Sequence, residues 1–175
     1  MSLREVLSEE MENSFAVTER LIRMVHSDQL AWKPATGSNW MTVGQLLWHC
    51  SSACGVAMRA FVTGEWGLPE GVEFKDLTPE DILPPAEKLP AVESIEQALQ
   101  LLGEDRQVGA SVLREVPEAD LLGRRFSPPW GGAECTLFQH LLHMIEHLGQ
   151  HKGQLFYYLK LLGHDVKTED LWGDL

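Results

Sequence analysis

Apolar residues recur at helical spacing in four stretches of this chain. Among the charged residues of 3–25, apolar side chains return every three or four positions, which predicts an amphipathic helix. The same pattern predicts helices over 42–63, 94–116 and 136–163. Each of these three begins with Ser or Thr followed three residues later by Gln, the pattern of a capping box. Gly163 suits the left-handed residue that ends many helices.

The segments between these helices are rich in Pro and Gly. Residues 27–40 form a connecting loop, and residues 117–134 form a second connector. The many Gly and Pro residues of 64–90 indicate an extended crossover, with one short helical turn near 78–82. No segment alternates strictly as a strand does, and no linker divides the chain. We therefore expect one all-α domain over residues 1–175, a four-helix bundle with long crossover connections.

The composition argues against nucleic acids and membranes as binding partners. The 175 residues carry 14 Lys and Arg against 26 Asp and Glu, a net charge of -12, which repels nucleic-acid phosphates and anionic lipids. No run approaches the ~18 apolar residues of a membrane span, and no signal peptide is recognisable. Cys50 and Cys54 lie one helical turn apart on an apolar stripe, so we expect buried thiols rather than a disulfide. These features predict a soluble cytoplasmic protein that binds neither nucleic acid nor membranes.

Four of the seven histidines lie in one stretch of twelve residues inside the last predicted helix. At about 100° per residue, His140, His143, His147 and His151 fall on one stripe that borders the apolar face. Side chains four residues apart stand one above the other, so His147 can share an ion with His151 or with His143. Gln154 and Tyr158 continue the stripe. We also expect Gly149 and Gly153 to allow a close helix contact beside it.

A third metal ligand has to come from another helix. His49 lies about 60° from Leu46 at the flank of the apolar stripe of the second helix, where an imidazole can reach a neighbouring helix. Two histidines of one helix and one of another make a three-nitrogen site for Zn²⁺ or Ni²⁺ that leaves one coordination position open. The zinc-protease motif H-E-x-x-H does not fit, because Leu148 stands where the general-base Glu is required. His143, Glu146 and His147 match the inverted H-x-x-E-H, but that motif belongs to large proteases that supply a downstream acidic ligand. The remaining alternative is that the histidines serve only packing and solvent contacts.

With these residues placed, the chain resembles the DinB-like superfamily of metal-binding four-helix bundles. That superfamily includes the bacillithiol S-transferases and, more distantly, the mycothiol-dependent maleylpyruvate isomerases. The stretch LAWKPATGSNWMTVGQLLWHC is similar to the loop and helix that carry the family's first metal histidine, here His49. The stretch EHLGQHKGQLFYYLKLLG is similar to its H-x-x-x-H-[RK]-G-Q pattern. The resemblance implies His49, His147 and His151 as ligands, and it also implies a homodimer.

The resemblance leaves the reaction open, because this fold carries different chemistries. One hypothesis is a metal-dependent thiol S-transferase or hydrolase that acts on a small molecule at the open position, with a low-molecular-weight thiol as a second cofactor. The other is a non-catalytic dimer that binds a metal or ligand and has a stress-related role. Gln154 and Tyr158 are candidates to orient a bound ligand, and Trp130 is a candidate for the mouth of a pocket. The catalytic residues are unknown, since nothing in the sequence places Glu65, Glu134 or Glu146 near the metal.

Overall fold

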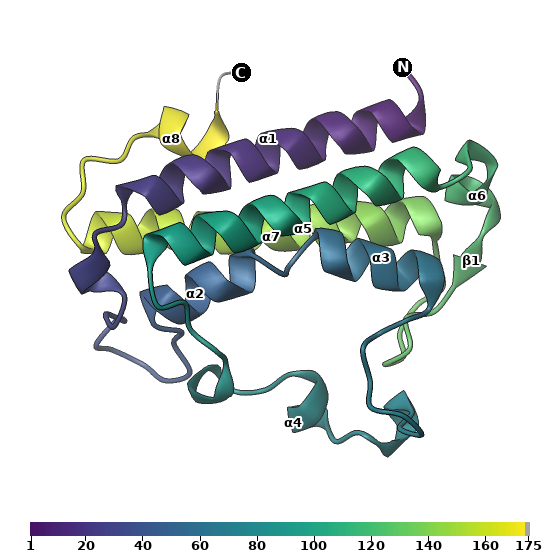
Figure 1. Cartoon of the computed structure of the whole chain (residues 1–175), viewed down its shortest axis with the longest axis horizontal. Coiled ribbons are helices and arrows are strands. Elements are labelled where there is room, and N and C mark those ends of the chain that lie inside the picture. The colour runs from purple at the N-terminus through teal and green to yellow at the C-terminus, as the bar shows by residue number, and fades with distance from the viewer. Residues whose placement is uncertain (174–175) are drawn as a thin grey trace.

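The computed structural model describes residues 1–173 and consists mainly of helices packed side by side (Figure 1). Three long helices run through the bundle, namely α1 (Leu3–Met24), α5 (Ile95–Glu115) and α7 (Leu137–Leu161). The shorter helices α2 (Val43–Cys50) and α3 (Gly55–Thr63) together take the fourth place. The predicted capping boxes form at the starts of α2 and α7, and the Ser94 hydroxyl caps α5. The all-α bundle predicted from the pattern of apolar residues is therefore confirmed.

The helix expected over 42–63 is broken at Ser51–Cys54, where the prediction of one continuous element was wrong. The carboxylate of Asp105 in α5 accepts hydrogen bonds from the main-chain N–H groups of Cys54, Gly55 and Val56, at 3.3, 2.8 and 2.7 Å. These N–H groups lack partners at a new helix N-terminus, and a buried carboxylate satisfies them. The break thus depends on a residue 50 positions away, which local sequence patterns do not report.

Shorter elements occupy the connections. The crossover contains 3-10 turns at Phe74–Asp76 and Ala86–Lys88 and the helix α4 (Pro79–Ile82), which confirms the helical turn predicted near 78–82. Another 3-10 turn, Ser27–Gln29, follows α1. The second connector holds α6 (Glu118–Gly123), and α8 (Thr168–Trp172) lies in the tail. Two strands that the sequence did not predict, β1 (Arg125–Phe126) and β2 (Cys135–Thr136), pair antiparallel over two residues each.

The core lies between the four bundle helices, and two glycines, Gly55 of α3 and Gly109 of α5, lie where these helices approach closely. A Cβ atom on Gly55 would stand 1.9 Å from the main-chain oxygen of Asp105, so α3 and α5 pack backbone to backbone there. Cys50 and Cys54 are fully buried free thiols, as expected. The close contact expected at Gly149 and Gly153 was wrong, because a Cβ on either would meet no atom within 4 Å.

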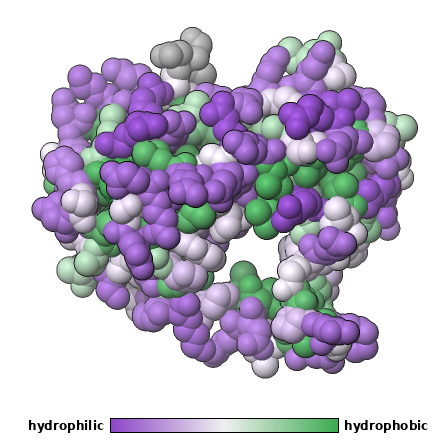
Figure 2. Space-filling model, viewed as in Figure 1, coloured by the Kyte–Doolittle hydropathy of each residue, from purple (hydrophilic) through white to green (hydrophobic). Residues whose placement is uncertain are grey.

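The crossover from α3 to α5 stands away from the bundle. In Figure 1 it leaves the end of α3, passes below the bundle through α4, and returns beside α2 to the start of α5. Figure 2 shows that the molecule is hollowed between this crossover and the bundle. The side of the bundle nearest the crossover carries α2 and α3. Among the described helices, none is long and apolar enough to cross a membrane.

Candidate metal centre

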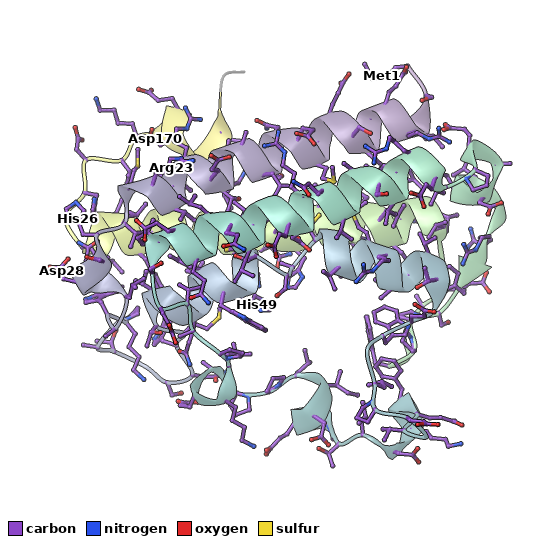
Figure 3. All side chains as sticks on the ribbon, viewed as in Figure 1. Met1, Arg23, His26, Asp28, His49 and Asp170 are labelled. Carbon is purple, nitrogen blue, oxygen red and sulfur yellow. The ribbon has the colours of Figure 1, made fainter. Side chains whose placement is uncertain are left out.

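Three histidine side chains meet at the side of the bundle that faces the crossover. Nε2 of His147 lies 3.3 Å from Nε2 of His49 and 3.0 Å from Nε2 of His151. One ring nitrogen from each of the three residues lies within 4.8 Å of the other two. Figure 3 places His49 on α2, on the side toward the hollow. The structure therefore brings together the three histidines that the sequence singled out.

Helix geometry explains this convergence. His147 and His151 are four residues apart in α7, so their rings stand one above the other and their centroids lie 4.8 Å apart. His49 lies near the end of α2, which packs against α7, and its ring meets that of His151 edge to face at 4.3 Å. All three side chains are half-buried. The site is consequently held by two rigid helices and remains open to solvent on one side.

The break between α2 and α3 orients His147. Nδ1 of His147 lies 3.2 Å from the main-chain oxygen of Ala53, and a carbonyl oxygen can only accept, so Nδ1 carries the hydrogen. Ala53 lies within the break, where its carbonyl points to a side chain instead of to the next helical turn. The Nε2 atom of His147 therefore presents a lone pair to the other two rings.

A chain of hydrogen bonds orients His151 in the same way. The hydroxyl of Tyr158 donates to the main-chain oxygen of Met41 at 3.0 Å and accepts from Nε2 of Gln154 at 3.1 Å. The remaining amide oxygen of Gln154 then faces Nδ1 of His151 at 3.2 Å and accepts its hydrogen. In metal centres such partners fix the tautomer of a histidine ligand and make it more basic. The polar atoms of Gln154 and Tyr158 are thus engaged with this chain, and their contact with a bound ligand stays a prediction.

Two lone pairs that face each other at 3.0 Å repel unless a cation lies between them. Tetrahedral Zn²⁺ with Zn–N bonds of about 2.0–2.1 Å requires its nitrogen ligands to lie about 3.3–3.4 Å apart. The spacings of His147 to His49 and to His151 are close to that value. The donor set, its spacing and the oriented Nδ1 atoms therefore fit a divalent metal ion.

Burial keeps these imidazoles neutral. It lowers the pKa of His49 to about 4, with smaller contributions from the nearby His151 and His147 rings. Burial also lowers the pKa of His147 and of His151, and for His151 the His147 ring adds to the effect. A neutral imidazole is the form that binds a metal. Near neutral pH, protons therefore compete weakly for these nitrogens.

The other two histidines of α7 lie outside the cluster. His140 is buried, its ring stacks between Phe61 and Phe126 at centroid distances of 4.6 and 4.5 Å, and its Nε2 lies 3.0 Å from the Phe126 carbonyl oxygen. His143 is exposed. The pairing of His143 with His147, which helical spacing alone allowed, is not the arrangement in the structure.

The acidic residues considered as catalytic bases do not join the three histidines. Glu134 pairs with Arg125 at 2.9 Å, and Glu65 and Glu146 are exposed. Among the described residues, the grouped metal-ligand atoms come from histidines alone. What sequence analysis missed was the carbonyl of Ala53. The Ala53 carbonyl can reach His147 because the helix is broken there. That break depends on the contact of Asp105 with residues 54–56, which the sequence pattern does not indicate.

The fold and this cluster define an all-α bundle protein with a candidate three-histidine metal centre. The family model of the DinB superfamily matches residues 10–155, and the chain belongs to this superfamily. It is similar to the crystal structure of a DinB-like protein, YjoA, from Bacillus subtilis. That match has a TM-score of 0.62 and 19% sequence identity, and it covers 91% of this chain and 94% of that one, which shows a shared fold. Comparison with curated proteins found no match.

Proposed function

We propose that this protein is a metal-dependent enzyme that acts on a small molecule, as a thiol S-transferase or as a hydrolase, with Zn²⁺ or Ni²⁺ held by His49, His147 and His151. The observation that carries the proposal is the convergence of the three Nε2 atoms, two of which are turned inward by hydrogen bonds at Nδ1. Three neutral protein ligands with a fourth position open are typical of catalytic zinc sites. A structural site would be closed by a fourth protein ligand.

The metal would supply Lewis-acid activation of a thiol or a water near neutral pH. The protein's own contribution is positioning. His147 is held by Ala53, and His151 is held through Gln154 and Tyr158, so neither ring has to reorient during a reaction. Because the imidazoles are uncharged, the full charge of the ion acts on the molecule in the open position. Half-burial of the three rings leaves that molecule a route from the hollow.

The proposal also includes a cytoplasmic location and a homodimer. The buried free thiols Cys50 and Cys54 suit a reducing cytoplasm, where low-molecular-weight thiols are abundant. The family resemblance supports a homodimer. The net charge of -12 argues against nucleic acid and membrane surfaces as partners.

A second function, a non-catalytic metal- or ligand-binding dimer with a stress-related role, is favoured by one observation. Among the described residues, no carboxylate belongs to the histidine cluster, and Glu134, which lies just before the last helix, is engaged with Arg125. Turnover without a nearby general base would rest on the metal alone. The two functions therefore differ in whether a bound thiol goes on to react.

Cobalt replacement tests the metal site that both functions share. We expect untagged protein to bind one equivalent of Co²⁺, and 2-mercaptoethanol to produce a thiolate-to-cobalt charge-transfer band. His49→Ala, His147→Ala and His151→Ala should each lose stoichiometric binding, whereas His143→Ala, an exposed histidine of the same helix, should retain it. Full binding by the three variants would refute the site.

Catalysis is then tested with the loaded protein, 2-mercaptoethanol and an alkyl halide, and separately with an activated ester. Acceleration of either reaction over the rate with His147→Ala supports an enzyme. Cobalt binding without any acceleration supports the non-catalytic function.

A further inference from the structure

The stripe of α7 that carries the metal histidines is covered by aromatic residues at both ends and open between them. At one end the buried His140 stacks between Phe61 and Phe126. At the other end the rings of Trp32 and Trp40 meet Tyr158 edge to face, at 5.2 and 6.2 Å. His147 lies seven residues after His140, and Tyr158 lies seven residues after His151. Each end is therefore about 10 Å along the helix from the nearest metal histidine.

The end nearer His140 continues into a cluster of half-buried and exposed aromatic rings. Trp66 of the crossover meets Phe74 and Trp130 at centroid distances of 5.7 and 5.2 Å, and Phe74 lies 6.1 Å from Trp130. Phe61 connects this cluster to the His140 stack, at 4.8 Å from Trp66. We call Trp66, Phe74 and Trp130 the aromatic cluster. Trp130 remains 45% exposed, so the cluster offers apolar surface that the chain itself does not cover.

This cluster joins the beginning of the crossover to the loop between β1 and β2. The crossover leaves the end of α3 at one side of the hollow, so the cluster belongs to that end of the bundle (Figures 1 and 2). The metal histidines and His140 lie along one stripe of α7, and Phe61 connects His140 to the cluster. A molecule bound at the open coordination position and extended along α7 toward His140 would meet the cluster.

The charge of the crossover restricts what such a molecule can carry. Residues 64–94 contain eight Asp and Glu and two Lys. Both lysines already pair with crossover acids, Lys75 with Glu73 and Lys88 with Glu80. An anionic substituent in the hollow would face this negative segment at short range, whereas an uncharged ring would not.

We propose that the aromatic cluster is the binding site for the apolar end of the substrate, and that the substrate is a small molecule whose uncharged aromatic or similarly apolar group is separated from the atom at the metal by at least the roughly 10 Å between His147 and His140 along α7. This proposal rests on the proposed function and names its substrate class. Edge-to-face packing on Trp66 and Trp130 adds to the burial of apolar area when a ring enters. The site therefore selects substrates by length as well as by polarity.

The test uses ω-phenylalkane thiols with one to eight methylene groups, titrated into cobalt-loaded protein and followed by the thiolate charge-transfer band. We expect affinity to rise by about tenfold once the phenyl ring reaches the cluster, since a ring that leaves water gains at least that factor. A carboxylate on the ring should remove the gain. Trp130→Ala and Trp66→Ala should remove it as well, while Trp172→Ala, an exposed tryptophan of α8 on the far side of the bundle, should keep it.

Retained cobalt stoichiometry and an unchanged cobalt spectrum in Trp130→Ala show that its fold and centre are intact. An affinity that does not depend on chain length, or a gain that survives in both Trp66→Ala and Trp130→Ala, overturns the proposal.

A second arm needs no metal. The alcohol 4-phenylbutan-1-ol, which lacks a metal-binding head, should show saturation transfer from the metal-free protein in NMR, and Trp130→Ala should abolish it. Protein that takes up no cobalt would refute the proposed function. In that case the alcohol experiment alone tests whether the aromatic cluster binds a phenyl group. Absence of saturation transfer with the parent protein would show that it does not.

Discussion

The hydroxyl of Tyr158 donates a hydrogen bond to the main-chain oxygen of Met41 across 3.0 Å, which ties the end of α7 to the residues just before α2. Met41 precedes the helix that carries His49, and Tyr158 begins the chain of hydrogen bonds that ends at His151. One contact between residues 117 positions apart thus links the two helices that supply the histidines. The geometry of the cluster and its hydrogen-bond support are parts of one arrangement.

Removing this contact should weaken metal binding more than stability. In Tyr158→Phe, Gln154 loses the acceptor that holds its amide, and Nδ1 of His151 loses a fixed partner. We expect zinc affinity to fall by about tenfold, the lower range for partners of metal ligands. Competition with a chromophoric chelator measures this. Tyr157→Phe alters the adjacent, 63% exposed tyrosine and should leave the affinity unchanged; an equal loss in both variants would contradict the role assigned to Tyr158.

Metal should stabilise the folded chain. A ligand that binds only the native state raises the free energy of unfolding by about 2.7 kcal/mol at a free concentration one hundred times its dissociation constant. We expect zinc to raise the Tm of the parent protein and a chelator to reverse the change. His147→Ala should show no such rise, and His143→Ala should behave as the parent protein does.

Asp105 should prove essential to the break between α2 and α3. Asp105→Ala leaves the N–H groups of residues 54–56 without their acceptor in a buried region, and we expect a loss of about 3 kcal/mol in urea unfolding. Because Ala53 lies in the same break, zinc affinity should fall too. Asp81→Ala removes an exposed carboxylate at the start of α4, and its effect should stay below about 1 kcal/mol. If a folded Asp105→Ala variant bound zinc with the affinity of the parent protein, the break between α2 and α3 would not be needed to orient the histidines.

Two glycine substitutions should act in opposite directions. Gly55→Ala drives a Cβ into the main chain of Asp105, 1.9 Å away, so α3 and α5 have to separate and the protein should be strongly destabilised. Gly149→Ala lies inside α7 with open space around its Cβ and should stabilise by about 0.5–1 kcal/mol. Chemical denaturation measures both. A stable Gly55→Ala variant would show that the two helices are not packed as closely as the structure has them.

The metal-free protein should lose stability as the pH falls below neutral. Well above pH 6.5, His49 is neutral in the folded and the unfolded chain, so it adds no pH dependence there. Between pH 6.5 and about 4 the unfolded chain takes up a proton that the folded chain refuses, because burial lowers the folded pKa of His49 to about 4. The free energy of unfolding should therefore decline from pH 6.5 to 5, a window in which most carboxylates stay ionised. His49→Gln should flatten this decline, and an unchanged slope would argue against the buried neutral imidazole.

The pattern of apolar residues determined the bundle by itself. Helix period and capping are local properties, so α1, α5 and α7 were predicted to within a few residues of their ends. The spacing of His147 and His151 fixed their common face for the same reason. Which histidine pair would join His49 was open on spacing alone, and the family resemblance, itself a property of the sequence, indicated His147 with His151.

Tertiary structure alone decided how the site is held. The break at Ser51–Cys54 exists because Asp105 of another helix satisfies a buried N-terminus, and the break in turn frees the carbonyl of Ala53 for His147. Tyr158 reaches Met41 only because α7 and α2 pack together. Hydrogen bonds between residues far apart in the chain leave no periodic trace, since their geometry depends on how whole helices lie against one another. The sequence could name the candidate metal-binding histidines, but only the fold shows what orients them.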